Sequence, residues 1–247
     1  MPYTTLDPDK IIATAASLER RITERFPDAG LAGVARELVT LARDTNEAAT
    51  RIARPIWWLR VIVAIVIAAG ALSFVFIGSI LTFDRIDRVG FGLVEQIEAS
   101  INTLVLIGLG LFALVRLEER FKRRKVMEGL HGMRSLIHVI DMHQLTKDPV
   151  LFSGDYKPTA SSPKRTMSPA DLKRYLDYCS ELLSITGKVA ALYAQALADR
   201  DVLEAVNDIE NLATNLSRKI WQKIMLADPR GTSAAKPPPR RKPASSK

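Results

Sequence analysis

Residues 61–83 read VIVAIVIAAGALSFVFIGSILTF, 23 residues without a charged side chain. A helix needs roughly 20 apolar residues to cross a hydrocarbon core about 30 Å thick. A core helix of a soluble protein would interrupt such a run with a polar face. The stretch therefore predicts a transmembrane helix, with Trp57 and Trp58 in an aromatic belt at the cytoplasmic interface.

A second apolar run, INTLVLIGLGLFALV at 101–115, is 15 residues long. It reaches spanning length if its helix extends from about Ile97 to Leu117, and the basic cluster that follows is typical of a membrane exit. The alternative is a buried or re-entrant segment. We predict a second span, joined to the first as a helical hairpin.

Charges around the two runs predict their orientation. Three arginines precede the first run (Arg51, Arg54 and Arg60), and RLEERFKRRK at 116–125 follows the second. The connecting segment 84–100 has two arginines against four acids. By the positive-inside rule, both termini face the cytoplasm of an inner (plasma) membrane. Abundant alanine and more arginine than lysine fit a bacterial protein.

The first 55 residues predict cytoplasmic amphipathic helices. Asp7-Pro8 is an N-cap followed by proline at the first helical position. Behind it, apolar residues recur every three or four positions from Ile11 to Phe26, as one face of a helix requires. After the break at 27–30, a similar stripe leads toward the first span.

The C-terminal part predicts a helical hairpin. Ser168-Pro169 opens one helix, and Asp199 to Asp201 form a short turn into the next, where Asp201 and Glu204 suggest a capping box. Two stripes with spacings of 3 and 4 follow, at Leu172–Ala196 and at Val202–Ile224. Helices joined by so short a turn pack antiparallel, and each stripe meets either the same chain or another subunit.

The predicted fold class is all-α: a two-span transmembrane hairpin with a cytoplasmic bundle of N- and C-terminal amphipathic helices. The predicted divisions are 1–55 (N-terminal helices), 56–83 (first span), 84–100 (short extracytoplasmic loop or interfacial helix), 101–117 (second span), 118–145 (helical extension with the histidines), 146–167 (linker), 168–228 (C-terminal hairpin) and 229–247 (basic tail).

Composition adds two expectations. The tail at 229–247 has six basic residues, five prolines and no acid, so it cannot bury a core and should be disordered. The only cysteine, Cys179, excludes an internal disulfide and, at a core spacing, is read as a small buried hydrophobe.

All three histidines lie in LHGMRSLIHVIDMHQL at 130–145. On a helix, His131, Arg134, His138 and Asp141 share one face. His138 and Asp141 are metal-ligand types, but His131 and His138 lie about 10 Å apart by helical rise, so one ion cannot bridge them unaided. The four residues are also candidates for acid–base chemistry. The preferred interpretation is a polar helix face that meets another helix.

The sequence contains no phosphate-binding glycine loop, no dinucleotide fingerprint and no nucleophile elbow, so a non-enzymatic protein without a cofactor is favoured. The basic cluster predicts contact with anionic lipid headgroups. Nothing points to specific nucleic-acid binding, because the tail lacks aromatic residues. The candidate lipid contacts are Arg116, Arg120, Lys122, Arg123, Arg124 and Lys125.

Three functions remain open from these patterns. The first is a membrane anchor or adaptor whose cytoplasmic helices bind a protein partner or form a homo-oligomer. The second is a membrane-tethered enzyme that acts on a lipid headgroup or nucleotide through His131, Arg134, His138 and Asp141. The third is an oligomeric pore or membrane-perturbing effector.

Overall fold

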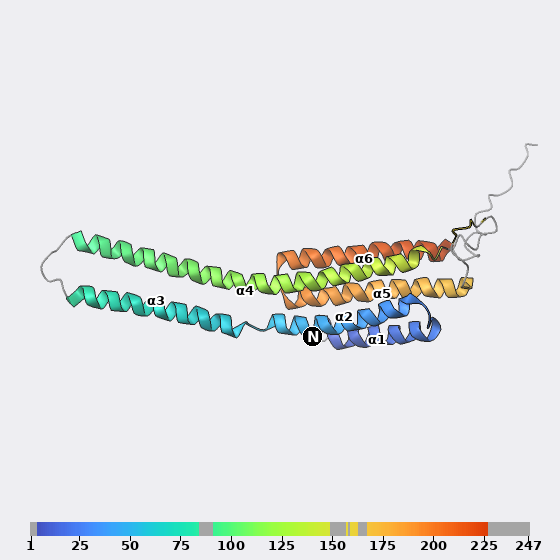
Figure 1. Cartoon of the computed structure of the whole chain (residues 1–247), viewed down its shortest axis with the longest axis horizontal. Helices are drawn as coiled ribbons and strands as arrows, with labels where there is room; N and C mark the ends of the chain where they lie inside the picture. Colours follow the sequence, from blue (N-terminus) through green and yellow to red (C-terminus); the bar gives the residue numbers. More distant parts are fainter. Residues whose placement is uncertain (1–3, 84–90, 149–156, 158, 163–166, 227–247) are drawn as a thin grey trace, which may run out of the picture. The chain divides into compact units, whose positions relative to one another are not determined.

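The computed structural model describes residues 4–83, 91–148, 157, 159–162 and 167–226. Every regular element in these residues is an α-helix, which confirms the all-α class (Figure 1). The helices are α1 (Pro8–Arg25), α2 (Gly30–Ala53), α3 (Trp57–Phe83), α4 (Phe91–Leu145), α5 (Pro169–Ala196) and α6 (Arg200–Leu226).

The chain divides into two compact units. Met1–Ala49 and Glu128–Lys247 form one unit, which we call the helical module. Thr50–Met127 form the other, which we call the hairpin unit. The module thus contains α1, most of α2, the last part of α4, and α5 with α6, while the hairpin unit contains α3 and the first part of α4.

Side-chain caps begin two of the module helices where the sequence predicts them. The Asp7 carboxylate accepts hydrogen bonds from the backbone N–H groups of Asp9 and Lys10, at 3.1 and 3.3 Å. The Ser168 hydroxyl accepts one from the backbone N–H of Asp171 at 3.1 Å. Each bond satisfies a donor that the first helical turn leaves unpaired.

The start of α6 differs from the expected capping box. The carboxylate of Asp199, not Asp201, accepts the backbone N–H groups of Asp201 and Val202, at 3.0 and 3.2 Å. Asp201 is already within the first turn of the helix. The capping prediction at Asp201 was therefore wrong by two residues, because DRD offers two acids and either could cap.

The predicted stripes of α5 and α6 are buried within the chain itself. Cys179, Leu182 and Val189 of the predicted stripe are buried on α5, and Val202 and Ile220 are buried on α6. α5 packs against both α6 and α1, and Figure 1 shows α5 and α6 side by side in opposite directions. The stripes therefore need no second subunit to cover them.

α4 supplies a further wall of the module core. Its residues Met133, Ile137 and Ile140 are completely inaccessible to solvent. A Cβ added at Gly129 would overlap the ring of Tyr193 on α5, with Cζ only 2.8 Å away. The backbone of α4 thus lies directly against a buried aromatic ring, a contact that only glycine permits.

Helix α4 begins earlier than the second apolar run. It is continuous from Phe91 to Leu145, so residues 91–100 are its first turns rather than a separate interfacial helix. Three predicted segments lie wholly or mostly outside the described residues: the rest of the connecting segment, the linker 146–167 and the basic tail.

In the hairpin unit, α3 exposes most of its apolar side chains between Trp57 and Ser73. An 18-residue window within Gly30–Ser73 has a mean hydropathy of 2.1, and only 6% of it is buried. By length and composition, one helix among the described residues can therefore cross a membrane. Side chains such as Leu72, which is 71% exposed, lie on the surface of this unit.

Candidate functional site

The polar face of α4 within the module holds the four residues selected from the sequence. Arg134, His131 and His138 are exposed, and Asp141 is half-buried. The Arg134 guanidinium lies 3.4 Å from the Asp208 carboxylate of α6. An exposed ion pair of this length contributes little to stability, but it fixes which helix this face of α4 meets.

Asp141 takes part in a polar network at the end of α4. Its carboxylate accepts a hydrogen bond of 2.6 Å from the side-chain amide of Gln144, which is buried. The Lys223 ammonium of α6 donates to the Gln144 amide oxygen at 2.7 Å and to the Gln144 backbone carbonyl at 3.3 Å. The same carbonyl also accepts the backbone N–H of Lys147 at 3.1 Å, so the cation adds a second bond at the helix C-terminus and interacts favourably with the helix dipole.

The structure does not bring the two exposed histidines into a ligand set. Among the described residues, no group of three or more His, Cys, Asp or Glu side chains could hold a metal ion. The ion pair with Asp208 places Arg134 in a contact between α4 and α6. Asp141 bonds within α4 to Gln144, and Gln144 in turn contacts Lys223 of α6. The arrangement is that of a helix-packing surface with two imidazoles at its outer edge.

The third histidine, His143, lies elsewhere in the module. A Cβ added at Gly30, the first residue of α2, would be 3.2 Å from its Nε2 atom. His143 therefore packs closely against the start of α2, where a Cβ at position 30 would overlap its ring. It also lines a cavity of about 720 Å³ formed by the α1–α2 turn, the end of α4 and the start of α5.

The floor of this cavity is aromatic and its rim is charged. Tyr175 is buried beneath it, and the Lys147 ammonium lies 5.4 Å from the centroid of that ring, a cation–π distance. Burial raises the pKa of Tyr175 well above its usual value. On the rim, Arg25 pairs with Asp171 at 2.9 Å. A hydrogen bond from Ser168, together with that from Arg25, lowers the pKa of the Asp171 carboxyl.

Cys179, one turn beyond Tyr175, is completely buried. Burial raises the pKa of its thiol to about 12, and the charges of Lys147 and Lys223 offset only part of that rise. Because the thiolate is the nucleophile, a thiol in this setting is inert. The structure thus confirms Cys179 as a small buried core residue.

The native protein should therefore resist thiol alkylation. At pH 8, we expect Cys179 to react roughly three orders of magnitude more slowly than an exposed cysteine, because its thiolate is that much scarcer. Mass spectrometry of iodoacetamide labelling measures both rates.

The comparison is the variant Cys179→Ala with Asn215→Cys, which places a thiol on the exposed side of α6. Labelling of Cys179 should rise about tenfold per pH unit up to pH 10, whereas the exposed thiol levels off near pH 9. Equal rates at pH 8 would disprove the buried assignment.

The basic cluster on α4 belongs to the hairpin unit. Lys122 pairs with Glu118 at 2.9 Å, and Arg116 pairs with Glu119 at 3.2 Å. Burial disfavours the charged Glu118 carboxylate. Hydrogen bonds from Lys122 and from the backbone N–H of Ile56, with the charges of Lys122 and Arg60, outweigh burial and lower its pKa. The remaining candidates for lipid contact lie on the same stretch: Arg120, Arg123, Arg124 and Lys125.

Sequence reasoning missed the residues that complete these contacts. Gln144 follows Asp141 by three positions, a spacing that helical periodicity could have identified. Nothing in the sequence pairs Lys223 with Gln144, or His143 with Gly30, because those residues are brought together only by the packing of different helices.

In the part of the chain that the structure describes, the fold and the site together define an all-helical protein with one helix apolar and long enough to cross a membrane, and with a helical module that has its own core. Comparison with protein-family models, with curated proteins and with solved structures finds no match to this chain.

Proposed function

We propose that the chain is a non-enzymatic membrane anchor that crosses the bilayer twice and presents its helical module to a protein partner. The proposal is carried by one contrast within the fold. The hairpin unit exposes apolar side chains on the described part of α3, from Trp57 to Phe76, while the module buries its own stripes almost completely. Such an exposed apolar belt is stable only against lipid or another apolar surface.

Contacts within the hairpin unit support α4 as the second span. The Ile56 backbone N–H donates to the Glu118 carboxylate at 3.2 Å, and a Cβ at Gly70 would lie 2.6 Å from Ile107 Cδ1. The partner on α4 moves back from Glu118 to Ile107 as the other residue of the pair moves forward from Ile56 to Gly70. The two helices are therefore antiparallel, and residues 101–115 lie beside the apolar part of α3. Small residues such as Gly70 allow this close helix packing in a bilayer.

The side chains on that part of α4 are also apolar and exposed. They are Ile101, Leu104, Val105, Leu106, Leu109, Phe112 and Val115. The hairpin thus offers lipid-compatible surface on both helices, flanked by Trp57 and Trp58 and by the basic cluster. We place both termini in the cytoplasm, where that cluster meets anionic headgroups.

Burial of the α5 and α6 stripes within the module favours binding to a different protein over self-assembly through those stripes. Because the stripes of α5 and α6 are covered by the same chain, oligomerisation would have to use other surfaces. A folded helical module attached to two spans is suited to hold a second protein at the membrane surface.

The test is affinity purification of the tagged full-length protein in mild detergent, with in-line mass determination and mass spectrometry. We expect a second protein at a fixed stoichiometry to the chain. A protein that purifies alone, as a monomer or as a homo-oligomer, from its native host would reject the adaptor function.

A further inference from the structure

The outer surface of the α5–α6 pair leaves two large apolar residues uncovered. Trp221 is 54% exposed and Met225 is 64% exposed. Because they lie four residues apart on α6, they share one face of the helix. Ile220, the residue before Trp221, is completely buried, so α6 is anchored in the core while this face points away from it.

These two residues form one wall of a groove, which we call the Trp221 groove. Its opposite wall is the first part of α5, with Lys173, Arg174 and Asp177, and its volume is about 340 Å³. Ile224, which is buried, contributes to its floor. An aromatic side chain in a concave site with arginine nearby is typical of the centre of a protein interface.

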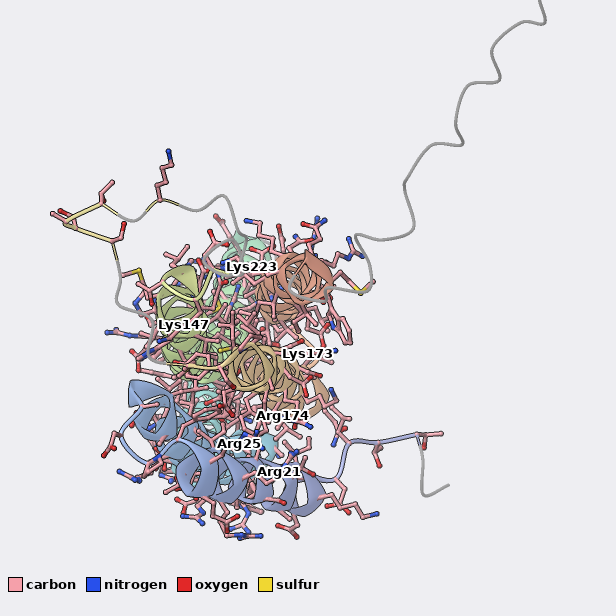
Figure 2. All side chains as sticks on the ribbon, turned by 90° about the vertical axis from the view of Figure 1, so that its right-hand side faces the viewer. Arg21, Arg25, Lys147, Lys173, Arg174 and Lys223 are labelled. Atoms are coloured by element: carbon pink, nitrogen blue, oxygen red, sulfur yellow. The ribbon has the colours of Figure 1, made fainter. Side chains whose placement is uncertain are left out.

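The edges of the groove carry a positive charge that none of the described residues neutralises. Arg174 pairs with Asp177 at 3.0 Å, which accounts for the only acid in the lining. Lys173, one residue earlier, has no ion-pair or hydrogen-bond partner among the described residues, and neither has the exposed Arg218, one turn before Trp221. Figure 2 shows Lys173 and Arg174 together on α5 at the end of the module that faces the viewer.

We propose that the Trp221 groove binds an acidic segment of a partner protein that carries at least one large apolar side chain. This inference rests on the proposed adaptor function and names the surface that it uses. The apolar side chain packs between Trp221 and Met225, and carboxylates of the same segment meet Lys173 and Arg218. Charge complementarity of this kind selects the partner and speeds the encounter.

Charge and shape also decide between possible occupants. The tail at 229–247 has six basic residues and no acid, so its charge does not complement the groove. A bilayer surface is flat, whereas Trp221 and Met225 line a concave site that also contains the Asp177 carboxylate. A convex acidic segment satisfies both features.

Tryptophan fluorescence can test the groove directly in the full-length protein. The chain has three tryptophans, so Trp57→Phe with Trp58→Phe leaves Trp221 as the only reporter. The probes are a short peptide of glutamate, leucine and phenylalanine, a second peptide with every glutamate replaced by lysine, and a third with every leucine and phenylalanine replaced by serine. Each is titrated against the detergent-solubilised protein.

We expect the acidic apolar peptide to give a saturable blue shift, and the other two peptides to give none. Lys173→Glu with Arg218→Glu should weaken binding at least about tenfold, which corresponds to about 1.4 kcal/mol. The matched control is Arg20→Glu with Arg36→Glu, two exposed arginines on α1 and α2, and it should leave binding unchanged.

Several results would overturn the inference. They are no blue shift with the acidic peptide, an equal shift with the lysine peptide, or equal weakening by the control variant. A blue shift caused by phosphatidylglycerol vesicles and not by the peptide would assign the groove to lipid instead. A red shift of Trp221 on deletion of 229–247 would assign it to the tail.

The inference and the adaptor function fail in different ways. If a stoichiometric partner is found and still binds the Lys173→Glu, Arg218→Glu protein, the adaptor function stands and the groove proposal falls. If the chain purifies without any partner, the adaptor function falls, whatever the peptides do.

Discussion

Replacing Ala68 and Leu72 of α3 with arginine will prevent the protein from inserting stably into membranes. Both residues are exposed and lie near the middle of the helix Trp57–Phe83, four positions apart on one face. Each arginine at the centre of a span costs about 2.5–3.5 kcal/mol of insertion free energy, so the pair costs about 5–7 kcal/mol. Carbonate extraction of isolated membranes, followed by immunoblotting, should find the variant in the soluble or aggregated fraction.

The matched control places the same two arginines on the module. Ser135 and Val139 of α4 are also exposed and four residues apart. Ser135→Arg with Val139→Arg should leave the protein in the membrane fraction at the wild-type level. If the α3 variant also remains resistant to carbonate, α3 is not a membrane span.

Gly129→Ala will destabilise the helical module, although alanine normally stabilises a helix. The added methyl group would overlap Tyr193, whose ring carbons Cζ and Cε2 lie 2.8 and 2.9 Å from its position. Tyr193 is itself buried, so neither the ring nor α4 can move freely. Overpacking of this kind costs about 1–3 kcal/mol. A lower midpoint of thermal unfolding, followed by near-ultraviolet circular dichroism in detergent, would show the loss.

Gly33→Ala is the control that separates the steric overlap at Gly129 from the general preference of helices for alanine over glycine. Gly33 is exposed on α2, and a Cβ there meets nothing within 4 Å. This variant should raise stability by about 0.5–1 kcal/mol, the usual gain from glycine to alanine inside a helix. Equal effects of the two substitutions, in either direction, would contradict the close packing of α4 against Tyr193.

Much of the helical architecture could be predicted because its signals are local. Asp7 and Ser168 cap helices, and the alternation of threes and fours in α5 and α6 identified residues that are buried. The charge-free run from Val61 identified the exposed apolar helix. Each of these depends on residues within a few turns of one another, which periodicity and capping rules describe well.

The contacts between helices could not be predicted in the same way. The face of His131, Arg134, His138 and Asp141 was recognised on α4, but Asp208, which pairs with Arg134, lies far along the chain on α6. Lys223 of α6, which bonds to the neighbouring Gln144, is equally distant in the sequence. Repeating patterns give the face that a helix buries and not the helix that covers it. The sequence also left open whether another subunit completes the α5 and α6 stripes, and only their burial within one chain answers that.

Cysteine accessibility in spheroplasts tests the membrane anchor most directly. In a Cys179→Ala background, single cysteines replace Thr5, Arg88 or Ser245, and a membrane-impermeant maleimide is applied before and after permeabilisation. We predict that Arg88→Cys is labelled in intact spheroplasts, and that Thr5→Cys and Ser245→Cys are labelled only after permeabilisation. Labelling of Thr5→Cys and Ser245→Cys from opposite sides of the membrane would contradict the two-span anchor.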